Sequence, residues 1–481
     1  MSHRDPGNTL ELSPPPEPLK SYLYKELARI GTDNSIQSLI LRGLTIVGGI
    51  DTTLLRRCFQ HVLDRHEILR TSFQPRVRLG PTVQKGWHPV CEALRTGSLT
   101  DSQVFHNVLF EQCIHRSCDL EIELVERDIR LDLSEQIKIE TADVTKHFDF
   151  SRVPMFRAKL LRVNEAECRL MLAAPHIALD GRSMTIVITE VFRCYAAADP
   201  EGRCLVKPKL SYGAFAAQLS ETEKSKPIYQ DAPPTVVLFD TERLDFRIRR
   251  GANTFGLFHI KRLEDRISYE GTGAAFVKGV ARAYRVTVPM LVFSCFATVL
   301  HLLAQQNHIV IVGARYNRAN SNSESVVGPL ADGVALAIDY SEIQTFREVT
   351  SQARNEFSDA AGELLTNRRT TVSEELQRSA DGPFHRSASI EVGWLPDYCV
   401  PGLTVEDFHI PPTLGSGDPG LILRVHHGEK RGIALTLNYC TDCFLKESVS
   451  RMLGAIVEMI RVVGDSPDIS ISDLHSITRS V

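Results

Sequence analysis

The chain has 481 residues, of which 43% are hydrophobic and 24% are charged, and its formal net charge is −4. This composition is ordinary for a soluble protein, and the length predicts two or more core-sized units. The near-neutral charge provides no broad basic surface for phosphate groups, so we expect no nucleic-acid partner.

The N-terminal stretch lacks the apolar core of a secretory signal, and its prolines predict a disordered or extended lead-in over residues 1–19. We therefore expect a cytoplasmic protein. One apolar segment, Val286–Ala304, is long enough to span a bilayer. Because it contains Pro289 and His301, we expect a helix buried between other elements and no contact with a membrane.

The 11 cysteines are scattered along the chain. Cys113 and Cys118 flank His115, and Cys440 and Cys443 form a single C-x-x-C pair. A structural zinc site needs four ligands in paired clusters, and no second pair lies near either group in the sequence. We expect no metal, and we expect free thiols in a reducing compartment.

Hydrophobic periodicity predicts an alternation of strands and helices. The expected strands are Ser38–Val47, Phe156–Val163, Cys168–Ala174, Thr254–Ile260, His308–Arg315 and Ile433–Tyr439. The first expected helix is capped by Asp51 and ends near Arg65. The other expected helices are Ser183–Ala196, Gly271–Tyr284, Thr287–Gln305 and Lys446–Val463. The second half repeats the helix-then-strand order of the first, which predicts two related lobes.

Three stretches give weaker signals. Gly80–Asp119 shows no clear period and is expected to be irregular, and Thr370–Ser389 is polar and expected to be a loop. Ile129–Ile137 alternates between apolar and polar residues, which is typical of a strand.

The polar, proline-containing residues 221–235 are the best candidate for a linker between lobes. The N-terminal lobe is then expected over residues 20–220 and the C-terminal lobe over residues 236–481.

The segment Leu170–Val187 carries the strongest chemical signal. An apolar run of strand length leads through a short loop into a helix that is expected to open at Ser183. His176 titrates near neutrality and could take a proton from a nucleophile. Asp180 could orient that imidazole or tie the loop down through a cation, and Gly181 would let the backbone turn where a Cβ would obstruct it. The pattern alone also fits a structural histidine beside an apolar run.

Six stretches match one family in order. They are R-H-E-I-L-R-T-S-F at Arg65–Phe73, H-F-D-F-S-R-V-P-M-F-R-A-K-L from His147, P-H-I-A-L-D-G-R-S from Pro175, Y-G-A-F-A at Tyr212–Ala216, I-V-I-V-G-A-R-Y-N-R at Ile309–Arg318 with Gly328 ten residues on, and L-N-Y-C-T-D-C-F at Leu437–Phe444. In these stretches the chain resembles the condensation domains of nonribosomal peptide synthetases and their freestanding H-x-x-x-D-G acyltransferase relatives.

The resemblance implies a mixed α/β (α+β) fold of two pseudo-symmetric lobes like those of chloramphenicol acetyltransferase. It further implies that the lobes form a V, with the active site in the tunnel between them. His176 would be the catalytic base in that tunnel. The oxyanion would be met by backbone N–H groups, that of Gly181 first among them, or by a hydroxyl.

The resemblance also assigns supporting roles. Asp180 would face away from the substrate and pair with Arg318 of the second lobe, with Arg70 as the alternative partner. Such a pair positions the loop and the lobes rather than taking part in the reaction. Ser183 would cap the helix first and donate its hydroxyl second.

Some features depart from the family pattern. Pro175 stands where condensation domains have the first histidine of their double-histidine motif, so only the second histidine is present. This single-histidine form is the one seen in plant-type acyltransferases, which use coenzyme A thioesters. Glu391–Pro396 resembles a conserved element of those enzymes in part. The bridging element of condensation domains is not recognisable near Arg368–Leu376, and no attached carrier or adenylation region is evident, so any carrier protein is expected to act in trans.

The resemblance implies an acyltransferase that transfers an acyl group from a thioester to an alcohol or an amine in specialised-metabolite biosynthesis. Acyl-coenzyme A or an acyl-phosphopantetheine carrier would be the co-substrate, no cofactor would stay bound, and we expect a monomer. No G-x-S-x-G element is present for a nucleophilic mechanism. The alternative is a non-catalytic module of the same fold that binds a carrier or another partner protein.

Overall fold

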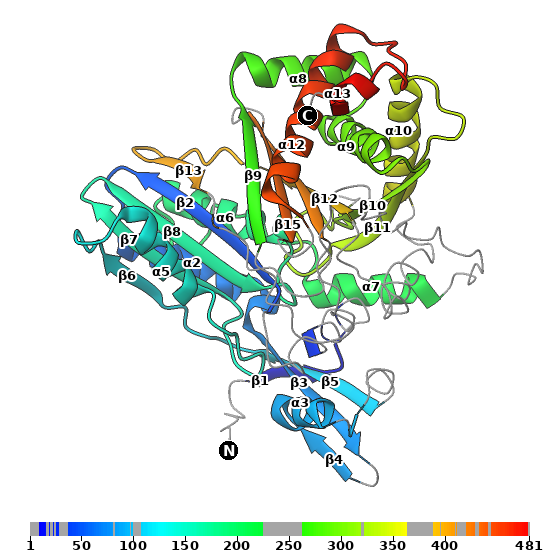
Figure 1. Cartoon of the computed structure of the whole chain (residues 1–481). Helices are drawn as coiled ribbons and strands as arrows, with labels where there is room; N and C mark the ends of the chain where they lie inside the picture. Colours follow the sequence, from blue (N-terminus) through cyan, green and yellow to red (C-terminus); the bar gives the residue numbers. More distant parts are fainter. Residues whose placement is uncertain are drawn as a thin grey trace. The chain divides into compact units, whose positions relative to one another are not determined.

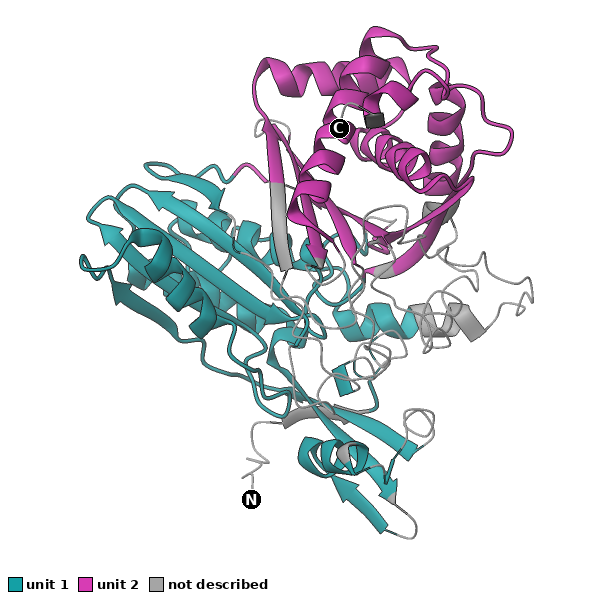
Figure 2. Cartoon of the chain, viewed as in Figure 1, with its two compact units in different colours: residues 1–224, 320–330, 398–416 teal, residues 225–319, 331–397, 417–481 magenta. Residues whose placement is uncertain are grey.

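The computed structural model describes residues 9–15, 19, 23, 26–27, 37–79, 82–96, 98–99, 107–224, 262–318, 322–362, 388–394, 396–408, 410, 420–428, 432–440 and 444–479. The chain divides into two compact units (Figure 2). Unit 1 comprises residues 1–224, 320–330 and 398–416, and unit 2 comprises residues 225–319, 331–397 and 417–481.

Unit 1 therefore includes two segments, 320–330 and 398–416, that the sequence analysis assigned to the second lobe. One of them supplies a strand of the unit 1 sheet and the other contacts a unit 1 helix, as described below. Residues 225–235 of the expected linker, the expected strand Thr254–Ile260 and residues 370–387 of the expected loop lie outside the described residues.

The main sheet of unit 1 has five strands (Figure 1). Their order is β13 (Thr404–Phe408), β2 (Leu39–Val47), β8 (Glu167–Pro175), β7 (Arg157–Asn164) and β6 (Ile122–Glu126). The pairings are antiparallel except for the parallel pair β6–β7. The predicted strands that became β2, β7 and β8 are confirmed to within a residue or two.

Helices cover both faces of this sheet. On one face α5 (Leu133–Val144) lies over β7 and β8, and the Thr141 hydroxyl donates to the Met171 sulfur. On the other face lie α6 (Gly181–Ala196) and α2 (Thr52–Arg65), which pack against each other. Since neighbouring residues of a strand point to opposite faces, Met171 faces α5 and Leu172 faces α6.

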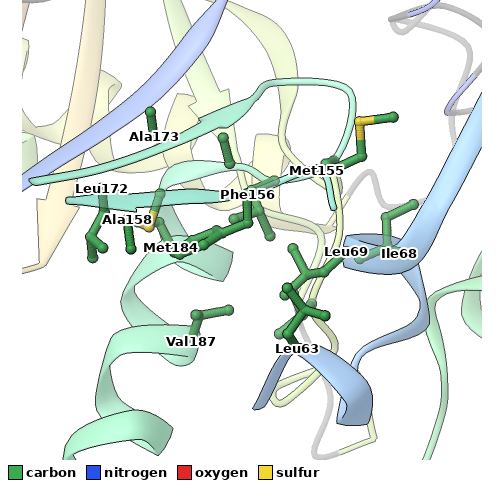
Figure 3. Close-up of a cluster of buried hydrophobic side chains, with 14 of the residues drawn as sticks. Leu63, Ile68, Leu69, Met155, Phe156, Ala158, Leu172, Ala173, Met184 and Val187 are labelled. Carbon is green, nitrogen blue, oxygen red and sulfur yellow. The ribbon is translucent and has the colours of Figure 1, made fainter. Parts of the chain in front are cut away.

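Figure 3 shows part of the apolar core between β7, β8, α6, α2 and the short 3-10 helix η1 (Glu67–Arg70). Its labelled members are all buried: Leu63, Ile68, Leu69, Met155, Phe156, Ala158, Leu172, Ala173, Met184 and Val187. Burying one large aliphatic side chain stabilises a fold by about 1.5–3 kcal/mol, so this cluster holds η1 and α6 firmly in place.

The local signals for α2 were read correctly from the sequence. Asp51 is its N-cap, and one carboxylate oxygen accepts from the Leu54 N–H at 2.9 Å. Six apolar side chains recur at helical spacing along α2. Five of them are buried, namely Leu55, Cys58, Phe59, Val62 and Leu63, and Leu54 is partly buried against the same core.

Unit 1 also contains a four-stranded antiparallel sheet that the sequence did not predict. Its order is β1 (Thr9–Ser13), β5 (Val108–His115), β3 (Thr71–Leu79) and β4 (Thr82–Lys85), and α3 (Trp87–Arg95) packs on it. Thr9–Ser13 is thus a strand and not part of a disordered lead-in, and Gly80–Asp119 contains three regular elements.

The physical reason for these errors is that the elements are short and their periods change within a few residues. In β5, buried and more exposed residues alternate strictly. In α3, Trp87, Val90, Cys91 and Leu94 recur at helical spacing on the side that faces the core. When hydrophobicity is averaged over a window that includes both elements, the two-residue period of β5 and the helical period of α3 obscure each other.

The expected strand Ile129–Ile137 is also wrong, because α5 begins at Leu133. Asp132 is its N-cap, and the carboxylate accepts from the Ser134 N–H at 2.9 Å. Ile129 is 88% exposed and precedes the helix. Asp132 as N-cap, followed by Glu135 three residues later, is a typical signal for the start of a helix. This signal decides the local structure here, in spite of the alternation of apolar and polar residues.

The described residues of unit 2 form a six-stranded sheet. The order is β11 (Asp332–Asp339), β10 (His308–Arg315), β12 (Ala388–Trp394), β14 (Leu421–His427), β15 (Ile433–Cys440) and β9 (Arg262–Tyr269). The packed helices are α8 (Thr272–Ala283), α9 (Val288–Ala304), α10 (Phe346–Gly362), α12 (Lys446–Asp465) and the short α13 (His475–Arg479).

The apolar segment Val286–Ala304 became α9, and its side chains are buried on nearly every side, as predicted. Among the described residues, no single helix has both the length and the apolar character needed to cross a bilayer. Helices α8 and α9 meet that criterion only as a pair, and they are bent by 82° where they join.

A buried lysine links α5 to the sheet of unit 1. Lys159 of β7 is 5% exposed, and its ammonium contacts Glu140 Oε2 at 2.7 Å, Asp143 Oδ2 at 2.5 Å and Glu123 Oε2 at 3.2 Å. Burial opposes the charge of Lys159, but the hydrogen bonds to the three carboxylates raise its pKa above the usual value. The hydrogen bonds from Lys146 and Lys159 lower the pKa of Asp143 to about 2.

We expect Lys159→Met to lower the free energy of unfolding by ~3 kcal/mol, because it leaves the buried Glu140 carboxylate without its cation. The matched control is Lys138→Met on the exposed side of α5, which should change stability by less than about 0.5 kcal/mol. Urea denaturation of the three proteins measures both values. Equal stability of the two variants would contradict the role of Lys159.

Candidate active site

The loop that carries His176 is set by the end of β8. Pro175 pairs with Leu39 of β2, whereas the pairing with β7 has already ended at Ala173. A proline is tolerated there because only one neighbouring strand flanks it. The Pro175 carbonyl accepts from the N–H groups of Ala178 at 2.8 Å and Leu179 at 3.2 Å, which closes the turn.

His176 is the one residue from Leu170 to Asp180 that is not buried. Its backbone N–H donates to the Ser38 carbonyl at 2.8 Å, so the main chain is fixed. The residue keeps partial access to solvent, although its ring Nδ1 is buried. A group on a ligand can therefore approach this side chain, as the predicted role of a base requires.

Asp180 is fully buried and anchors the far end of the turn. It is the N-cap of α6, and its Oδ1 accepts from the Ser183 N–H at 2.7 Å. Its Oδ2 accepts from the Leu330 N–H at 3.0 Å, across 150 residues of sequence. The carboxylate thus joins the start of α6 to the segment 322–330 within unit 1.

The two arginines proposed as partners of Asp180 both donate to backbone carbonyls. Arg70 donates to the backbone carbonyls of Asp64, at 3.2 Å, and His115. Arg318 donates from Nη1 to the Tyr316 carbonyl at 3.0 Å. A pair between Asp180 and Arg318 stays a prediction.

Ser183 differs from its expected role. The helix begins at Gly181 and Asp180 caps it, so Ser183 is the third helical residue and not the cap. Its buried hydroxyl donates to the Gly328 carbonyl at 2.7 Å and accepts from the Gly328 N–H at 2.9 Å. The single hydroxyl proton is therefore engaged by Gly328.

Gly328 is required at this contact because a Cβ there would lie 2.0 Å from Cδ2 of Tyr212. Tyr212 is the first residue of α7 (Tyr212–Lys224) and is buried. The next residue, Gly213, donates its N–H to Glu67 Oε1 at 2.9 Å. Matched stretches that are far apart in sequence thus meet around the N-terminus of α6.

The R-H-E stretch also holds the middle of α6. Glu190 is buried, and its Oε2 lies 2.7 Å from His66 Nε2 and 3.3 Å from Arg65 Nε. The Arg65 guanidinium and the His66 imidazole thereby give the buried Glu190 carboxylate its partners. These contacts give Arg65 a structural role beside α6.

The reason expected for Gly181 is wrong. It is the exposed first residue of α6, its φ is not positive, and a Cβ added to it would have no atom within 4 Å. The turn therefore does not need a glycine for steric reasons. The free space lies beside the first N–H groups of α6, which carry the positive end of the helix dipole.

The described residues contain no group of three or more His, Cys, Asp or Glu side chains arranged to hold a metal ion. Cys113, Cys118 and His115 are therefore not joined in such a site. The side chains of Cys440 and Cys443 lie outside the described part of the chain.

We expect Ser183→Ala to lower the free energy of unfolding by ~2 kcal/mol, because it leaves the buried N–H and carbonyl of Gly328 without their partner. The matched control is Thr189→Ala on the same helix, whose hydroxyl bonds only to the Thr185 carbonyl one turn away. That variant should differ from wild type by less than about 0.5 kcal/mol. Equal losses for the two variants in thermal denaturation would contradict the bridging role of Ser183.

Comparison with known proteins gives a consistent result. The family model described as "Condensation domain" matches residues 90–363. Surfactin synthase subunit 2 of Bacillus subtilis (strain 168) is 24% identical over 472 residues, which cover 96% of this chain. Those residues are 12% of that protein, so the chain spans only a small part of the length of this curated relative.

Solved structures of the same fold cover almost the whole chain. The condensation domain of the monacolin K polyketide synthase MokA is 14% identical, with a TM-score of 0.71 over 96% of this chain and 100% of that one. The X-domain in its complex with OxyB from teicoplanin biosynthesis is 18% identical, with a TM-score of 0.63 over 98% of this chain and 97% of that one. These likenesses confirm the predicted mixed helix-and-strand fold.

Proposed function

The chain belongs to the condensation-domain family, and on that premise we propose that it transfers an acyl group from a thioester to an amine or an alcohol. One observation carries the proposal: the half-buried His176 follows the end of β8 and is held by the buried cap Asp180. This arrangement exposes an imidazole on a rigid turn, which is what a general base needs.

In the proposed reaction, His176 removes a proton from the acceptor as its nitrogen or oxygen attacks the thioester carbonyl. A tetrahedral intermediate forms, and its oxyanion is stabilised by backbone N–H groups at the start of α6, with Gly181 first among them. The carbon–sulfur bond then breaks and the imidazolium returns the proton to the departing thiolate. A thioester is already activated, so positioning and one proton relay suffice.

Asp180 has a positioning role in this mechanism. Both of its carboxylate oxygens accept hydrogen bonds from backbone N–H groups, from Ser183 and from Leu330. The residue thereby fixes the turn that presents His176, and it does not need to carry a proton.

The donor is either acyl-coenzyme A or an acyl-phosphopantetheine group on a carrier protein, and no bound cofactor is needed for the step. Similarity to surfactin synthase subunit 2 supports a carrier-bound donor and a place in peptide or polyketide biosynthesis. Pro175, in place of the first histidine, supports a coenzyme A donor instead.

A second candidate is a non-catalytic module that binds a carrier or another partner protein. Two observations favour it. Pro175 removes one imidazole of the family motif, and the fold also occurs in an X-domain that forms a complex with OxyB. An assay for acyl transfer separates the two candidates.

We expect His176→Ala to reduce acyl transfer by at least about 10²-fold, because it removes the proposed general base. The unfolding temperature should stay near that of wild type, since the imidazole is only half-buried. The assay incubates the protein with a panel of acyl-thioesters and an added amine or alcohol, and it measures the thiol released. His308→Ala, which removes an exposed histidine of unit 2, is the control.

An active His176→Ala variant would contradict the role of His176. Absence of acceptor-dependent thiol release by the wild-type protein, across donors on coenzyme A and on carrier proteins, would instead favour the binding module.

We expect Gly181→Ala to leave the unfolding temperature unchanged, because a Cβ at this position would contact no other atom. Turnover should fall about tenfold if the added methyl group occupies space that the acyl carbonyl needs beside the helix N-terminus. Gly279→Ala in α8, where a Cβ also has no neighbour within 4 Å, is the control and should keep full activity. Unchanged kcat/KM in Gly181→Ala would exclude Gly181 from the substrate site.

A further inference from the structure

Two cysteines meet at the end of the helix that carries Asp180. Cys194 lies in the last turn of α6, and Cys204 lies in the loop that follows. Their sulfur atoms are 3.8 Å apart, within unit 1. The acyl-transfer mechanism uses neither thiol.

The loop between them is folded back by its own hydrogen bonds. The Asp199 N–H donates to the Cys194 carbonyl at 2.9 Å, and the Asp199 carboxylate accepts from the Cys204 N–H at 2.7 Å. Gly202 has a φ of +67°, and a Cβ there would lie 2.0 Å from Nε2 of His61 on α2. The backbone thus brings the two sulfur atoms together without help from a covalent bond.

The two thiols have different environments. Cys194 is fully buried, and burial together with its hydrogen bond to Cys204 raises its pKa. Cys204 is exposed. A dissolved oxidant therefore reaches Cys204 first, while Cys194 stays protected from direct attack. An exposed thiol with a second thiol beside it is the arrangement that lets a sulfenic acid be captured as a disulfide.

We propose that Cys194 and Cys204 are a modification site at which a peroxide forms a reversible disulfide. The Cys204 sulfur attacks the peroxide, the O–O bond breaks, and Cys204 becomes a sulfenic acid with release of one water. The Cys194 sulfur then attacks the Cys204 sulfur, the S–OH bond breaks, and the hydroxide leaves as water with the Cys194 proton. Two thiols lose two electrons in total, and one hydrogen peroxide becomes two waters.

The bond would close a short loop and join the last turn of α6 to the segment that leads toward α7. Its main effect would be on stability, because a cross-link restricts the unfolded chain. Cys58 of α2 is the competing partner, because it lies near Cys204. Its thiol is buried, and burial together with Cys204 raises its pKa.

Peroxide titration with peptide mapping tests the proposal. Trypsin cleaves after Arg193 and Arg203, which places the two thiols in separate peptides, Cys194–Arg203 and Cys204–Lys209. After low doses of hydrogen peroxide on the full chain, we expect these peptides joined, with a mass two hydrogens below their sum. Dithiothreitol should separate them, and the unfolding temperature should rise by about 5 °C on oxidation.

Matched variants make the result specific. Cys204→Ser and Cys194→Ser should abolish both the linked peptide and the rise in unfolding temperature. Cys58→Ser and Cys399→Ser should retain both, the latter because it removes a different exposed thiol. The proposal is overturned if Cys204 joins Cys58 or a second chain, or if it is oxidised to sulfinic acid while Cys194 stays reduced.

Discussion

The carboxylate of Asp180 is the interaction on which the rest of unit 1 depends. It is fully buried at the N-terminus of α6, where two backbone N–H groups and the positive end of the helix dipole stabilise its charge. A buried charge without such partners would cost several kcal/mol, so the helix start and the Leu330 segment must stay together. The turn between β8 and α6 is thereby fixed at both ends, and His176 is presented from a rigid frame.

Several of the matched stretches meet within unit 1 around α6, the helix that this carboxylate caps. Glu67 contacts Gly213, Ser183 contacts Gly328, and His66 contacts Glu190, each pair more than 100 residues apart in sequence. These contacts need particular side chains, and at Gly328 they leave no room for a Cβ. For this reason the residues that make them form recognisable patterns in the sequence. The same contacts explain why residues 320–330 belong to unit 1, although they follow the start of unit 2 along the chain.

The strands and helices that could be predicted from the sequence are those with a strong local signal. β7, β8, α6 and α9 have long apolar periods, and their positions were predicted well. The start of α5 was missed because an apparent alternation ran into a capped helix. Asp180 accepts from the backbone N–H of Leu330, a group that every residue except proline offers, so no sequence pattern could have indicated this contact. The pairing of Asp180 with an arginine stays a prediction.

Pro175 shows how the family motif can change without loss of the turn. At the end of β8 only β2 flanks it, so its missing N–H removes no pairing with β7. Its carbonyl still accepts from Ala178 and Leu179, which keeps the loop closed. Replacement of a histidine by proline at this position therefore removes an ionisable side chain and leaves the support of His176 intact. The turn then carries one imidazole, that of His176, and the proposed acyl transfer depends on it.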